Sequence, residues 1–223
     1  MSVTGASAED SSHRAIAILA AAKAASGGEV WDKITGWHER GTHGSVAYET
    51  LLDYRQYGAL FRHTRDGKTS VRGYNGAVAW DMGPDGQVTV STDTKRLADA
   101  RLSTYGSTAA YFFPDRFPAR FEYLGQRAEG NAHYDRLRIT PEGANSFEIW
   151  IDRSTHLVAK LVDRTGPKPV VATMSGYKDV NGLKLPSGFS VGDGTAAHTE
   201  QAQVQSYELV PVARSDFDPP APK

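Results

Sequence analysis

Histidines are the side chains in this sequence best suited to bind a metal ion or to transfer protons near neutral pH. There are seven, of which His38 and His43 lie five residues apart in one predicted strand, so they fall on opposite faces of it. No H-E-x-x-H motif and no His-x-His pair occurs, and the chain contains no cysteine. The sequence therefore predicts no metal site, no thiolate chemistry and no cofactor.

The remaining motifs do not assemble a catalytic group. Residues 192–197 match the letters G-x-G-x-x-A, but the dinucleotide fingerprint is followed by a helix, and here a strand-like segment follows. No G-x-S-x-G motif and no Walker loop occurs. Carboxylates such as Glu148 and Asp152 fall on predicted strand edges or faces, where a solvated side chain is the ordinary outcome. We predict no catalytic residue and expect a protein that is not an enzyme.

Aromatic residues are the most informative chemical group, because they make up 10% of the chain and occur in most predicted elements. For any single ring, packing in the core is the simplest explanation. Taken together, rings on a curved sheet with helices lying across it favour an apolar cavity wherever packing is incomplete. An apolar binding cavity is the one site that the sequence favours.

Length and composition narrow the classes of protein. The chain has 223 residues, of which 39% are hydrophobic, enough for a sizeable core, so global disorder is excluded. Lys and Arg number 25 against 26 Asp and Glu, so the basic excess of a nucleic-acid-binding protein is missing. No apolar run approaches the roughly 18 residues that a membrane-spanning helix needs. We expect neither nucleic acid as a partner nor a transmembrane segment.

Two helical segments must position such a cavity. The first covers residues 11–26 and ends at Gly27, which is followed by a second glycine suited to the left-handed conformation. The second covers residues 93–105, with Asp93 as a candidate cap, and a short aromatic helix follows at residues 108–113. This helical insertion within a run of strands is the most informative feature of the organisation.

Most of the remaining chain alternates between apolar and polar residues, which predicts strands. Asn75 and Gly76 separate two such patterns and indicate a hairpin, since both residues tolerate positive φ. Short turns describe an antiparallel meander of about eleven strands, and a sheet that large has to curl or close. The predicted fold class is α+β: a strongly curved antiparallel sheet forming a half-open barrel. The N-terminal helix and the mid-chain helical insertion are expected to cover its concave face.

Three segments are expected along the chain. Residues 1–11 are predicted to be disordered or an N-terminal addition, and residues 12–210 form a single domain. Residues 211–223 contain several prolines and are predicted to form a tail or linker.

Several turn and hairpin signatures occur in an order that is typical of a known superfamily. They are Gly27-Gly28 with Trp31 and Ile34; Gly41-Thr42; the run from Gly73 to Asp81; the run from Ile149 to Asp152 with Leu157-Val158; the run from Tyr177 to Pro186; and Phe217. On these residues the chain resembles the superfamily of the bacterial lipoprotein carriers LolA and LolB. It looks most like a LolA-like module of exported bacterial proteins that sometimes precedes a retropepsin-like aspartic protease domain.

The resemblance implies an unclosed antiparallel barrel in the cell envelope, with helices over its concave face. In the carriers that cavity holds lipoprotein acyl chains. A periplasmic or otherwise exported location is therefore expected, with a signal peptide removed from this chain. Residues 1–10 contain no basic start and no apolar stretch, so a cytoplasmic location stays the alternative.

Our leading hypothesis is a non-enzymatic envelope protein that holds an apolar small molecule, a lipid or an acyl chain in the cavity. Movement of residues 97–113 would open and close it. Strand parity predicts that the ligand-binding wall is formed by Trp37, Tyr48, Leu52, Phe61, Val78, Trp80, Leu97, Leu102, Phe112, Ile149 and Ile151.

Two alternatives stay open. The chain could be a non-catalytic interaction or propeptide-like domain whose proline-bearing tail joins it to a protease or other protein partner. It could also be a hydrolase or isomerase using the same cavity, which would require a polar cluster inside.

Overall fold

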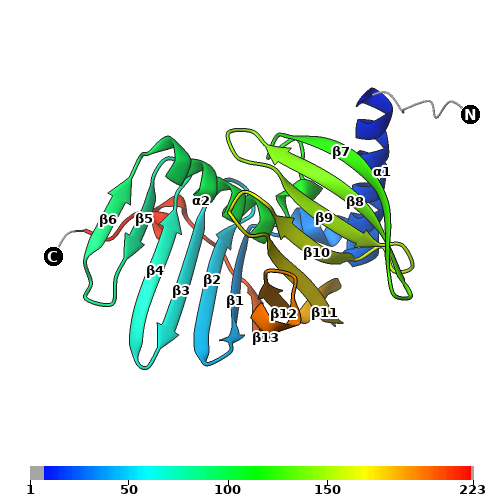
Figure 1. Cartoon of the computed structure of the whole chain (residues 1–223). Helices are drawn as coiled ribbons and strands as arrows, with labels where there is room; N and C mark the ends of the chain where they lie inside the picture. Colours follow the sequence, from blue (N-terminus) through cyan, green and yellow to red (C-terminus); the bar gives the residue numbers. More distant parts are fainter. Residues whose placement is uncertain (1–7, 222–223) are drawn as a thin grey trace, which may run out of the picture.

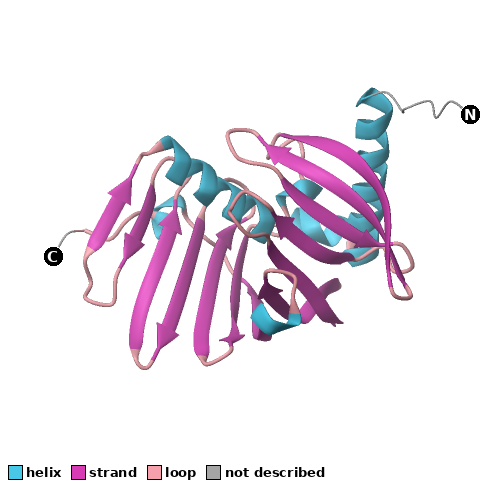
Figure 2. Cartoon of the chain, in the orientation of Figure 1, coloured by secondary structure: helices cyan, strands magenta, loops and turns pink. Residues whose placement is uncertain are grey.

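The computed structural model describes residues 8–221, in which thirteen strands form one antiparallel sheet (Figures 1 and 2). The strands are ordered β6-β5-β4-β3-β2-β1-β13-β12-β11-β10-β9-β8-β7. The sheet is strongly curved and open, with one N-terminal helix and one mid-chain helix, so the predicted half-open barrel of class α+β is confirmed. The sheet has two more strands than the approximately eleven expected.

The first half of the sheet is a meander in which each strand pairs with the next one along the chain. Its strands are β1 (Gly36–His43), β2 (Val46–Asp53), β3 (Ala59–Arg65), β4 (Lys68–Tyr74), β5 (Ala79–Met82) and β6 (Val88–Ser91).

The second half is also a meander, and its last strand returns to pair with β1. Its strands are β7 (Ala119–Glu129), β8 (Ala132–Pro141), β9 (Phe147–Asp152), β10 (Val158–Asp163), β11 (Val170–Val180), β12 (Leu183–Gly192) and β13 (Thr199–Leu209). The β1–β13 pair joins the halves, and β6 and β7 are left as the two edges.

The mid-chain helix α2 (Thr94–Ser107) connects those two edges. Because β6 and β7 lie at opposite ends of the sheet, this connection has to cross the concave face. Asp93 accepts a hydrogen bond from the backbone of Arg96 over 3.0 Å, which confirms the expected cap. A short aromatic helix, η2 (Ala110–Phe112), follows α2 as predicted.

The N-terminal helix α1 (Ala8–Ser26) starts earlier than expected. Residues 8–11, predicted to be disordered, are helical, whereas residues 1–7 lie outside the described part of the chain. The Ser11 hydroxyl donates to the Tyr123 carbonyl over 3.3 Å and accepts from the Tyr123 amide over 2.9 Å. These bonds anchor the first turns of α1 on β7, which explains why the helix extends to Ala8.

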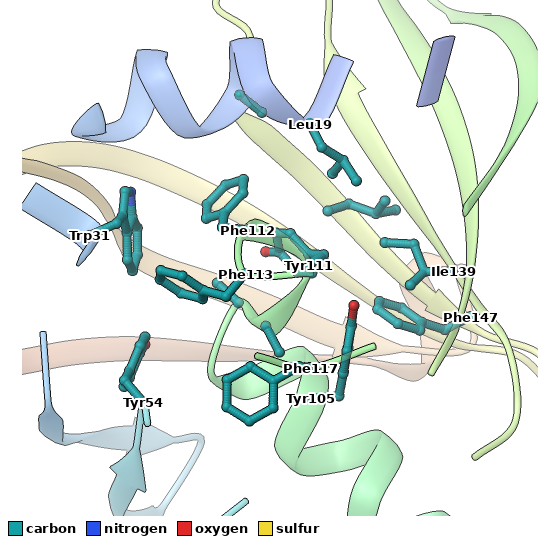
Figure 3. Packing of buried hydrophobic residues seen from close by; sticks show 14 of the residues in the cluster. Leu19, Trp31, Tyr54, Tyr105, Tyr111, Phe112, Phe113, Phe117, Ile139 and Phe147 are labelled. Atoms are coloured by element: carbon teal, nitrogen blue, oxygen red, sulfur yellow. The ribbon is translucent and has the colours of Figure 1, made fainter. Parts of the chain in front are cut away.

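Side chains from both helical segments form one core with the sheet. Figure 3 shows Tyr111 and Phe112 between Leu19 of α1 and Tyr105 of α2. The Phe112 ring lies 5.5 Å from that of Trp31, which belongs to the 3₁₀ turn η1 (Gly28–Lys33). The core lies between the helices and the sheet, and it includes Trp37 and Leu52 of the first half as well as residues of the second half.

The segment after β13 packs on the sheet, although residues 211–223 were predicted to form a tail or linker. Val212 is buried, and Phe217, in the 3₁₀ turn η4 (Arg214–Phe217), is only 1% exposed. The Trp80 indole N–H donates to the Phe217 carbonyl over 2.9 Å. Residues 210–218 therefore form a strap against the first half of the sheet.

Candidate functional site

A cavity of about 890 Å³ lies on one face of the curved sheet, which we call the inner face. Strands β1 to β4 form one side of its wall, strands β10 to β13 form the other, and α2 with η2 covers it. The volume lies within the roughly 300–1,000 Å³ of ordinary small-molecule sites. The wall is mainly apolar and includes Trp37, Leu52, Phe61, Leu161, Met174 and Phe189.

Strand alternation places these side chains. On β2 the inner face carries Tyr48, Thr50 and Leu52. The antiparallel register aligns Thr50 with Glu39 of β1 and with Phe61 of β3. The wall is thus a regular pattern of cross-strand rows, held by backbone hydrogen bonds.

Six of the eleven residues predicted to bind ligand lie together in the cavity wall. They are Trp37, Tyr48, Leu52, Phe61, Leu102 and Phe112. They come from β1, β2, β3, α2 and η2, so the structure brings together segments far apart in the chain. That these six bind ligand stays a prediction.

Val78 and Trp80 lie elsewhere. The Asn75 side chain accepts hydrogen bonds from the amides of Ala77 and Val78, which makes the loop longer than a two-residue hairpin turn, so β5 begins only at Ala79. Trp80 faces away from the cavity, over Gly73, where the strap of residues 210–218 covers it. Large apolar side chains are therefore buried on both faces of this part of the sheet.

Three other predicted residues also lie outside the wall. Ile149 and Ile151 point to the inner face of β9, but they belong to the packed core beneath α1 and η2. Leu97 lies on α2 without reaching the cavity. Around Ile149 and Ile151 the helical segments fill the inner face of the sheet.

The polar side chains of the cavity wall were not predicted. Glu39 accepts a hydrogen bond of 2.7 Å from the Tyr48 hydroxyl. Burial raises the pKa of the Glu39 carboxyl, although hydrogen bonds from Tyr48 and Trp37 act in the opposite direction. The signal was present in the sequence, because the alternation that places Trp37 inward also places Glu39 inward.

The wall also contains the polar residues His43, His63 and Arg72. Burial lowers the pKa of His63, and the nearby positive groups Arg72 and His43 lower it further. His38 lies on the other face, with Nε2 3.7 Å from Glu49. The expectation that His38 and His43 occupy opposite faces is therefore confirmed.

Arg101 of α2 holds the helix to both halves of the sheet. Its Nε donates to the Tyr74 hydroxyl of β4 over 3.3 Å, and its Nη1 donates to the Glu142 carbonyl after β8 over 2.9 Å. The guanidinium also lies 5.0 Å from the centre of the Tyr57 ring. The Arg101 side chain thus connects α2, which lies over the cavity, to both halves of the sheet.

The cavity offers a mainly apolar surface that can surround a ligand. Within residues 8–221 no three His, Asp or Glu side chains gather as potential metal ligands. Over the same residues, no helix is both long enough and apolar enough to span a membrane. The wall offers apolar contact over most of its area and also carries charged side chains, among them Glu39, Arg72 and Lys184.

Comparisons with known proteins identify the fold. No family model matches the sequence, and no curated protein is similar to it in sequence. Solved structures do match. A LolA superfamily protein from Nitrosomonas europaea is 12% identical with a TM-score of 0.57, and the match covers 92% of this chain and 97% of that one.

Two further structures agree. A DUF1329 family protein from Desulfovibrio piger is 13% identical with a TM-score of 0.58, covering 92% of this chain and 97% of that one. A domain named for outer membrane lipoprotein sorting, from Vibrio parahaemolyticus, is 12% identical with a TM-score of 0.59, covering 93% and 97%. At these identities the likeness concerns the fold: the chain has the fold of the LolA superfamily.

Proposed function

We propose that the protein is a non-enzymatic binding protein of the cell envelope that holds a lipid or acyl chain in its cavity. The observation that carries the proposal is the cavity of about 890 Å³, lined by aromatic and aliphatic side chains and covered by α2. Similar structures named for the LolA superfamily and for outer membrane lipoprotein sorting support both the ligand class and the location.

Burial of alkyl groups supplies the binding free energy. Each methylene group moved from water into an apolar site contributes about 0.8 kcal/mol. Two more methylene groups should therefore tighten binding by about 15-fold while the cavity still has room. Movement of α2 and η2, which lie over the cavity, would widen its entrance.

The test uses the neutral fluorescent probe N-phenyl-1-naphthylamine, displaced by octanol, decanol and dodecanol. We expect the inhibition constant to fall steeply with chain length. Ala172→Trp should weaken binding of the probe and of every alcohol, because Ala172 lines the cavity and an indole there would occupy it.

Thr173→Trp is the matched control, because Thr173 is the next residue of β11 and points to the other face. It should leave the affinities unchanged while placing the same indole on the same strand. Affinities that do not depend on chain length, or equal effects of the two variants, would contradict the proposal.

A further inference from the structure

Most charged groups in the cavity wall already have partners. Lys95 pairs with Asp99 at 3.0 Å on α2, and Asp163 accepts hydrogen bonds from the amide and hydroxyl of Thr165. Within the described residues, Arg72 and Lys184 are the lining cations that form neither an ion pair nor a hydrogen bond through their side chains. Of these two, Arg72 has further basic groups beside it.

The surroundings of Arg72 carry an excess of positive charge. Its cross-strand neighbours are Phe61 on β3 and Asp81 on β5. The Asp81 carboxylate is paired with Arg96 of α2, so the carboxylate nearest to Arg72 in the register already has a cationic partner. His63 lies two residues beyond Phe61 on the same strand and the same face.

A second hollow of about 530 Å³ adjoins the cavity at this point, because His43 and His63 belong to both walls. Its wall also contains Arg65 and Lys68, which the carboxylates of Asp66 and Glu200 balance in number. The Glu200 carboxylate lies 3.3 Å from His43 Nε2. The hollow therefore adds room for a bulkier polar group without cancelling the charge of Arg72.

We propose that Arg72 and His63 receive the acidic head group of an amphiphile, a carboxylate or a phosphate ester, whose alkyl chain runs past Phe61 into the cavity. This inference rests on the proposed binding function and specifies its ligand class. A guanidinium suits such a head group, since its planar N–H groups form paired hydrogen bonds with two oxygens. Because Arg72 and His63 lie on adjacent paired strands, the two groups are held in a fixed relation.

The test compares three ligands with the same chain: dodecanol, dodecanoate and dodecyl phosphate, each displacing N-phenyl-1-naphthylamine at pH 8. Dodecanoate, dodecyl phosphate or both should bind about tenfold more tightly than dodecanol. Arg72→Gln should remove this preference, because it should weaken binding of the two anions about tenfold more than it weakens binding of dodecanol. Arg62→Gln is the control, because Arg62 lies on the other face of β3, where it contacts Glu49 at 3.8 Å.

The outcomes separate this inference from the function on which it rests. If no ligand binds, the proposed binding function itself fails. If dodecanol binds as tightly as both anions, or if Arg72→Gln weakens all three equally, the head-group site is refuted and the binding function stands. Inorganic phosphate that binds without a chain and displaces neither anion would assign Arg72 to free phosphate and also refute the amphiphile.

Discussion

At the scale of single residues, the half-buried carboxyl of Glu39 is the unusual feature of the cavity. It faces the apolar wall and takes its 2.7 Å hydrogen bond from the Tyr48 hydroxyl. Its negative charge also affects three tyrosines. Burial is the main cause that raises the pKa of Tyr48, Tyr54 and Tyr207, and the Glu39 charge is the second cause for each. Glu39 thus stands among hydroxyl groups, with no cation paired to it in the described residues.

This environment predicts a pH-dependent stability. Burial raises the pKa of Glu39 above its ordinary value of 4.5, so the folded state holds the proton more tightly than the unfolded state. Stability from this group is present below pH 4.5 and is lost as pH rises through the raised pKa. Glu39→Gln removes that loss and still accepts the Tyr48 hydrogen bond.

Thermal unfolding of wild type and Glu39→Gln at pH 4 and pH 7 measures the effect. The melting temperature of Glu39→Gln minus that of wild type should be larger at pH 7 than at pH 4. Glu49→Gln, on the other face of β2, is the control and should show little pH-dependent difference. A variant that loses stability relative to wild type as pH rises would contradict the burial argument.

Residue positions were predictable where one face of a strand is covered. Alternation placed Trp37, Leu52 and Phe61 in the wall, because the other face of β1 to β3 carries polar groups there. It failed for Trp80, since the strap of residues 210–218 buries the opposite face. Alternation tells which residues share a face, and only the distant chain segments tell which face is inside.

At the scale of elements, the mid-chain insertion was predictable and its role follows from topology. The Asp93 cap and the helical periodicity after it predicted α2. Because β6 and β7 are the two edges of the sheet, α2 connects one edge to the other. The packing of residues 211–218 was not predictable from composition, because the prolines there indicate a linker. The contacts that hold the segment, such as Phe217 against Gly58 and the hydrogen bond from Trp80, involve residues distant in the chain.

The bridging role of Arg101 predicts a kinetic phenotype. Arg101→Ala removes the hydrogen bonds to the Tyr74 hydroxyl and the Glu142 carbonyl, which tie α2 to both halves of the sheet. Dissociation of N-phenyl-1-naphthylamine, followed by stopped-flow fluorescence, should accelerate by about tenfold, as expected for lost charge-assisted hydrogen bonds. Arg40→Ala removes an exposed pair with Glu208 on the other face of β1 and should leave the rate unchanged. Equal rates for Arg101→Ala and wild type would exclude α2 as the gate.

At the scale of the whole molecule, the cavity results from unequal filling of one curved sheet. Leu19 of α1 and Tyr111 of η2 help to fill the inner face beneath β7 to β9 (Figure 3). No comparable helix lies over β1 to β4, where only α2 crosses (Figure 1). The sequence predicted curvature and two helices, but their relative positions depend on contacts between distant segments such as Ser11 and Tyr123.

The most direct test of the account is a crystal structure with dodecanoate that carries a terminal bromine, located by its anomalous scattering. The account predicts a bromine peak inside the cavity, within about 4 Å of Leu161, Met174 or Phe189, the contact distance for apolar atoms. Bromine found only on the outer surface at saturating ligand, with the cavity unoccupied, would contradict it.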